Sequence, residues 1–131
     1  MKTKQLTCVI CPNGCELTIA YEETPAVVVK EVSGHTCDKG LAWAEQELLN
    51  PVRTIASSIA VESGAFPLVS VRTDSPIPLD RITGVMQAIR ALRVTAPVRI
   101  GDVLLRTPAG TACNIVATRH VAEDRRSKSA W

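Results

Sequence analysis

The sequence predicts an α+β fold: a small N-terminal cysteine-rich β-hairpin lobe, followed by an antiparallel sheet with one packed helix. Pairs of short β-branched runs are separated by turn residues, and a later segment carries apolar residues at helical spacing. Four of the five cysteines lie within the first 37 residues. We therefore expect a cysteine-rich lobe at residues 1–54, an α+β domain at 55–122 and a flexible C-terminal tail at 123–131.

The expected elements of the first lobe are two strands and a short helix. Residues 17–21 and 27–32 are rich in β-branched and aromatic side chains, and the turn between them contains a proline, so they predict a β-hairpin. Residues 34–40 are expected to form a loop. The Ala, Leu, Glu and Gln content of residues 41–49 favours a short helix that ends before Pro51.

The second part is expected to contain four strands and one longer helix. Residues 55–62, 67–73, 98–105 and 113–118 predict strands, and residues 79–92 predict the helix. Five apolar side chains of that helix fall on one face: Ile82, Val85, Met86, Ile89 and Leu92. A helix with such a stripe packs against a sheet, so we interpret these residues as core.

The composition excludes several classes of protein. Apolar residues make up 46% of the chain and aromatic residues 3%, which indicates an aliphatic core and no stacking platform for single-stranded nucleic acid. A net charge of +2 is too small to indicate nucleic-acid binding. We expect no membrane span, because no apolar run approaches about 18 residues. The polar start lacks a signal-peptide core, so we expect a cytoplasmic protein.

Four cysteines carry the strongest functional signal in the sequence. Their spacing is Cys8-x2-Cys11-x3-Cys15-x21-Cys37. The first three share one loop, in which Pro12-Asn13-Gly14 favours a tight turn whose N–H groups point toward the sulfurs. The hairpin after this loop runs out and back over similar lengths, so it returns the chain to its origin. We therefore expect the four thiolates to converge on one metal centre.

The spacing leaves three kinds of site open. Three ligands in one run with a fourth apart are typical of a [4Fe–4S] cluster. Zn²⁺ more often takes two separated pairs, and here it would give a zinc-stabilised structural or assembly module. Thiol–disulfide exchange at Cys8 and Cys11 is less favoured, because redox C-x-x-C pairs usually follow a strand and begin a helix.

Four other side chains have both a functional and a purely structural interpretation. The functional interpretation of Lys39 is that it offsets the charge of the cluster or faces a partner protein, and the structural one is that it is a solvated lysine. His35 either lies close to the metal ligands or is exposed. Trp43 would shield the centre from water, although lone tryptophans are usually core residues. Cys113 lies in an apolar run and is interpreted as a buried small hydrophobe. We find no catalytic triad and no phosphate-binding glycine loop, and we expect no substrate site.

Three segments carry a family resemblance: Cys8–Cys15, Gly34–Gly40 and Asn50–Arg53. Together they resemble the N-terminal [4Fe–4S] segment of molybdopterin oxidoreductases such as formate dehydrogenases. Taken over residues 6–119, the chain more closely resembles a family of small uncharacterised bacterial proteins named for paired C-x-x-C motifs. A chain of 131 residues has no room for pterin-binding domains, so only the cluster motif is carried over.

The resemblance implies partner proteins and a role in a complex, neither of which can be inferred from the residues alone. Such proteins are typically encoded beside FAD-dependent dehydrogenases of the glycerol-3-phosphate or 2-hydroxyglutarate type, together with a second, pyridine-nucleotide-linked flavoprotein. It implies an electron-transfer subunit of such a complex, with one [4Fe–4S] cluster on Cys8, Cys11, Cys15 and Cys37.

Overall fold

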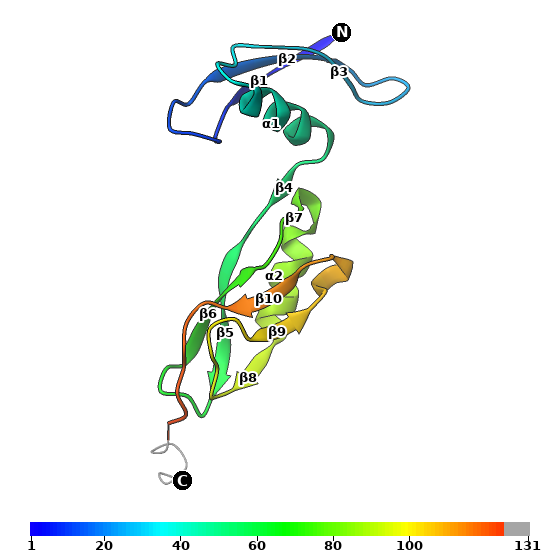
Figure 1. Cartoon of the computed structure of the whole chain (residues 1–131). Coiled ribbons are helices and arrows are strands. Elements are labelled where there is room, and N and C mark those ends of the chain that lie inside the picture. The colour runs from blue at the N-terminus through cyan, green and yellow to red at the C-terminus, as the bar shows by residue number, and fades with distance from the viewer. Residues whose placement is uncertain (125–131) are drawn as a thin grey trace. The chain divides into compact units, whose positions relative to one another are not determined.

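The computed structural model describes residues 1–124, which have the α+β fold that the sequence predicts (Figure 1). The chain forms two compact units that divide between Val52 and Arg53. No helix within the described residues is long and apolar enough to cross a membrane.

The first unit is a three-stranded antiparallel sheet with one helix. Strands β1 (Lys2–Thr7), β2 (Glu16–Glu22) and β3 (Val28–Ser33) pair in the order β1-β2-β3. Helix α1 (Asp38–Leu49) packs on this sheet (Figure 1), and Ala44 joins Leu17 and Ile19 in a buried core. The sequence predicted a two-stranded hairpin, and β1 is the strand it missed.

The physical reason for the missed strand lies in the position of β1 at the sheet edge. Almost every side chain of Lys2–Thr7 is exposed, so the strand lacks the alternation of apolar and polar residues that marks a half-buried strand. Lysines on an edge strand also discourage pairing with other chains. Its six residues pair in register with β2 from Lys2 opposite Tyr21 to Thr7 opposite Glu16.

The second unit contains a five-stranded sheet in the order β8-β5-β6-β10-β9. Its strands are β5 (Ala56–Glu62), β6 (Leu68–Thr73), β8 (Arg93–Thr95), β9 (Val103–Arg106) and β10 (Asn114–Ala117). Two further short strands, β4 (Val52–Arg53) and β7 (Ile77–Pro78), form a separate ladder. Short 3₁₀ helices occur at Leu79–Arg81 (η1) and Pro108–Gly110 (η2).

One strand departs from the antiparallel sheet that the sequence predicts. β8 pairs with β5 in parallel, with Ala60 opposite Arg93 and Glu62 opposite Thr95, whereas the other pairs of this sheet are antiparallel. Parallel neighbours need a crossover connection, and helix α2 (Ile82–Ala91) lies in the segment between them. The predicted strand at residues 98–105 is confined to β9, because Gly101 adopts a φ of +90° and the segment before β9 turns.

Helix α2 packs its apolar stripe on this sheet, which confirms the predicted core face. Val85 and Ile89 are fully buried, and Ile82, Met86 and Leu92 pack around them. Their sheet partners are the buried side chains Ile59, Val69, Val71, Ile115 and Ala117. The core of this unit is therefore almost entirely aliphatic.

Ile89→Ala is expected to destabilise the second unit by about 2–5 kcal/mol, because the truncation leaves a cavity in a close-packed core. Ile89 is 1% exposed. The matched change Ile100→Ala removes the same atoms from a side chain that is 57% exposed, so it should change stability by only about 0.5 kcal/mol. Urea denaturation followed by circular dichroism measures both, and equal effects would contradict the assigned core.

The predicted tail at 123–131 lies largely outside the described residues. Its first two residues are described, and both lie beside the turn after β5. Glu123 forms a bridge with Gly64, and the amide of Asp124 donates to the carbonyl oxygen of Ser63 at 2.8 Å.

Candidate metal centre

The loop that carries the first three cysteines connects β1 to β2. The amide of Cys8 donates to the carbonyl oxygen of Cys15 at 2.8 Å, which extends the β1–β2 ladder by one bond and closes the loop. Within it Gly14 adopts a φ of +60°, the left-handed conformation expected for the Pro12-Asn13-Gly14 turn. Cys8, Cys11 and Cys15 are thus held on one short loop at the end of an antiparallel sheet.

Strand β3 returns the chain to this loop, as the hairpin argument predicts. Ser33, its last residue, lies opposite Thr18 near the start of β2. The next residue, Gly34, has a φ of +88° and lies against the backbone of Glu16, where a β-carbon would stand 2.1 Å from the carbonyl oxygen. This close crossing directs the segment from His35 to Cys37 alongside Cys15.

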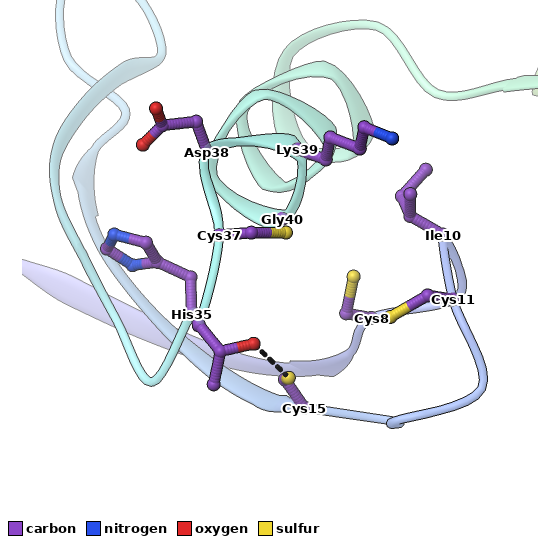
Figure 2. A pocket seen from close by; sticks show the side chains of 10 residues that line it. Cys8, Ile10, Cys11, Cys15, His35, Cys37, Asp38, Lys39 and Gly40 are labelled. Atoms are coloured by element: carbon purple, nitrogen blue, oxygen red, sulfur yellow. Dashed lines mark hydrogen bonds between the residues drawn. The ribbon is translucent and has the colours of Figure 1, made fainter.

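All four predicted cysteines line one cavity of about 430 Å³. Figure 2 shows the sulfurs of Cys8, Cys11 and Cys15 on one side and that of Cys37 on the other, pointing inward. Cys8 is buried, Cys11 and Cys15 are half-buried, and Cys37 is exposed. A volume of this size is within the range of pockets for small molecules and cofactors, roughly 300–1,000 Å³.

The first turn of α1 also lines this cavity, through Asp38, Lys39 and Gly40. Cys37 is the residue before the helix, with an extended backbone and no side-chain capping bond, so its sulfur is not used to cap the helix. The N–H groups of a first turn lack carbonyl partners in the helix and form the positive end of its dipole. Thiolates or an anionic cluster placed here are stabilised by about 0.3–1 kcal/mol per charge.

Gly40 allows this helix start to approach the cysteine loop. A β-carbon at this position would lie 3.7 Å from Cys8 Sγ and 3.4 Å from the β-carbon of His35. The glycine backbone is therefore in direct reach of the sulfur of the buried Cys8. The residue was noted in the sequence only as part of a loop, because its role depends on where the helix begins.

Two residues that precede Cys37 lie next to the cysteine cavity. The hydroxyl of Thr36 lies 3.3 Å from Cys15 Sγ (Figure 2), and so links the lone-cysteine segment to the three-cysteine loop. Thr36 carries no signal in the sequence except its position directly before Cys37. His35 lines the cavity, but its ring projects away from the sulfurs, and its buried Nδ1 finds no hydrogen-bond partner within residues 1–124.

The remaining residues singled out in the sequence are placed as follows. Lys39 lines the cavity, whereas Trp43 packs against the core of the first unit and is not part of the cavity wall. Cys113 is a buried member of the aliphatic core of the second unit, with Thr111 Oγ1 3.3 Å from its sulfur. This confirms the interpretation of Cys113 as a small hydrophobe.

The donor set is that of a thiolate metal centre. Four cysteine sulfurs line one cavity, although within residues 1–124 no three His, Cys, Asp or Glu side chains are grouped closely enough to hold a metal ion. Four thiolates can hold a [4Fe–4S] cluster, one on each iron, and they also suit tetrahedral Zn²⁺. The cavity of about 430 Å³ therefore offers the ligands that an iron–sulfur cluster needs, next to a helix start.

Fold and site together define a small α+β protein with a four-cysteine candidate metal centre. The chain belongs to the family described as "Protein of unknown function (DUF1667)", whose model matches residues 38–119. The match therefore begins directly after Cys37. No curated protein matches the chain.

One solved structure supports the fold. The NMR structure of the Clostridium perfringens protein CPE0013 is similar, with a TM-score of 0.51 and 20% sequence identity. The similarity covers 56% of this chain and 88% of that one. At this level of identity the likeness concerns the fold alone.

Proposed function

We propose that this chain is an iron–sulfur electron-transfer subunit, with one [4Fe–4S] cluster held by Cys8, Cys11, Cys15 and Cys37. The observation that carries the proposal is the convergence of four cysteines, distant in sequence by up to 29 positions, on one cavity at a helix N-terminus. When bound, the cluster supplies one-electron chemistry: it accepts one electron and returns one. Backbone amides and burial of Cys8 tune its potential.

The partners that we propose are an FAD-dependent dehydrogenase as electron donor and a second, pyridine-nucleotide-linked flavoprotein. The resemblance to small proteins with paired C-x-x-C motifs supports this pairing. A reduced flavin releases two electrons and two protons on oxidation, whereas one [4Fe–4S] cluster accepts a single electron. The flavin therefore passes its electrons one at a time, either to two oxidised chains or to one chain that is reoxidised between the two steps, while the protons pass to solvent. We further propose a cytoplasmic location, because reducing compartments keep thiols free.

Anaerobic purification tests the proposed cofactor directly. We expect brown protein with about four iron and four sulfide per chain, and visible absorption that dithionite bleaches. Colourless protein with about one zinc per chain would instead identify a zinc-stabilised structural module, because four thiolates also suit tetrahedral Zn²⁺. Metal-free protein with a reactive, readily oxidised Cys8–Cys11 pair would indicate a thiol oxidoreductase.

A further inference from the structure

Two large apolar side chains stand exposed beside the cysteine cavity. Val9 and Ile10, between Cys8 and Cys11, are 72% and 47% exposed. Single exposed apolar residues are ordinary, but an adjacent pair at the mouth of a candidate cofactor site suggests a contact surface. Ile10 lines the cavity and Val9 does not, so a bound cluster would leave at least Val9 uncovered.

A positive charge lies on the same side of the cavity. Lys39 is exposed, is the only lysine or arginine in the cavity wall, and forms no ion pair with any of residues 1–124. Figure 2 shows Lys39 and Ile10 on one side of the sulfurs, with Asp38 and His35 on the other. The exposed face beside the cysteines thus combines apolar area with a cation that has no ion-pair partner in the described part of the chain.

Resting on the proposed function, we propose that Val9, Ile10 and Lys39 form a docking rim for a flavoprotein that presents an apolar surface with carboxylates around its flavin. Electron tunnelling falls exponentially with distance, so a donor must dock where the centre is nearest to the surface. The exposed Cys37 and the rim mark that place. Redox encounters bury little area, often below about 1,200 Å², and so a rim of a few residues suffices.

The two kinds of side chain serve different steps of this encounter. Lys39 attracts an acidic surface over a distance comparable with the Debye length and sets the rate of association. Val9 and Ile10 exclude water at the centre of the contact. Each encounter moves one electron from the reduced flavin to an oxidised centre, and the other electron leaves in a second encounter, with another oxidised chain or with the same chain after its centre has been reoxidised. A second copy of the chain is a poorer occupant, because it would bring a second Lys39 to the same rim.

The test uses the purified holoprotein and three electron donors in stopped-flow: flavodoxin hydroquinone as the acidic flavoprotein probe, free reduced FMN, and dithionite. Val9→Gln combined with Ile10→Gln is expected to slow reduction by flavodoxin several-fold or more, because it removes apolar contact area without adding charge. Reduction by the two small donors, both of which are anions, should stay within about twofold of the original rate. The matched control changes Val27 and Val28, 42% and 45% exposed and absent from the cavity wall, to glutamine.

A second variant tests the electrostatic part separately. Lys39→Gln should slow reduction by flavodoxin several-fold at low ionic strength, and the difference should disappear at about 1 M salt, where the Debye length is about 3 Å. A salt-independent loss would mean that Lys39 acts on the cluster rather than on docking.

Several outcomes would contradict the proposed docking rim and leave the proposed cofactor unaffected. The presence of the cofactor is established first, from the iron and sulfide content and the colour of the protein. The contradicting outcomes are an unchanged flavodoxin rate in the double variant, an equal loss with all three donors, an equal loss in the control, and no reduction of the original protein by flavodoxin. Dimerisation that the double variant abolishes would assign the rim to a second copy instead.

Discussion

Replacing Cys37 with alanine is expected to eliminate the four-iron centre while the chain stays folded. The side chain is exposed and makes no capping bond, so its removal costs little packing. It is the single ligand contributed from outside the β1–β2 loop, and without it one corner of the cube has no thiolate. Iron should fall from about four to about three or fewer per chain, and the EPR signal of the dithionite-reduced [4Fe–4S] cluster should disappear.

The fifth cysteine provides the control for this experiment. Cys113→Ala removes a thiol from the aliphatic core of the second unit, and Cys113 is not one of the residues that line the cysteine cavity. It should lower stability by about 1 kcal/mol through lost packing, while iron, sulfide and the visible spectrum stay unchanged. If Cys37→Ala keeps a full [4Fe–4S] spectrum, the assignment of Cys37 as a ligand is wrong, whatever the other three cysteines do.

Three elements that the sequence predicted have one buried face. Strands β2 and β6 and helix α2 carry apolar residues at period two or at helical spacing, because their other face meets solvent. β1 lacked that signal because it is an exposed edge. β8 was missed because it has only three residues and pairs in parallel. Its sequence therefore contains neither a hairpin turn nor a long alternation of apolar and polar residues that would indicate a strand.

The start of α1 illustrates a different limit. The sequence predicted a helix from Leu41, whereas it begins at Asp38. Cys37 is a poor capping residue and Gly40 a poor helix former, so local preference argued for a loop. The earlier start matters for function, because it brings the helix N-terminus into the cavity wall.

The features of the candidate site that depend on the spacing of the cysteines in the sequence were predictable, whereas those that depend on the packing and burial of the loops were not. Cysteine spacing and a returning hairpin were enough to bring Cys37 back toward the other three, since strand lengths fix where a hairpin ends. The contact of Thr36 with Cys15 and the exposure of Val9 depend on how two loops are packed, and so does the buried Nδ1 of His35, which has no hydrogen-bond partner among residues 1–124. No pattern in the sequence encodes that packing.

The crossing at Gly34 explains why the hairpin returns so closely. Gly34→Ala is expected to destabilise the first unit by about 3 kcal/mol or more, because two costs add. An alanine at a φ of +88° is strained by about 1–2 kcal/mol. Its β-carbon would also lie 2.1 Å from the carbonyl oxygen of Glu16, a backbone atom in the first residue of β2, and shifting the backbone to relieve such an overlap costs about 1–3 kcal/mol.

Gly101→Ala separates these two costs. Gly101 has a φ of +90°, but a β-carbon there meets nothing within 4 Å, so only the backbone strain of about 1–2 kcal/mol applies. Hydrogen exchange of each unit's own peptides measures both effects. Because the Gly34 crossing also aims Cys37 at the cavity, Gly34→Ala should lose iron as well, whereas Gly101→Ala should keep it. Full iron content and unchanged protection of β2 and β3 in Gly34→Ala would show that the crossing does not position the fourth ligand.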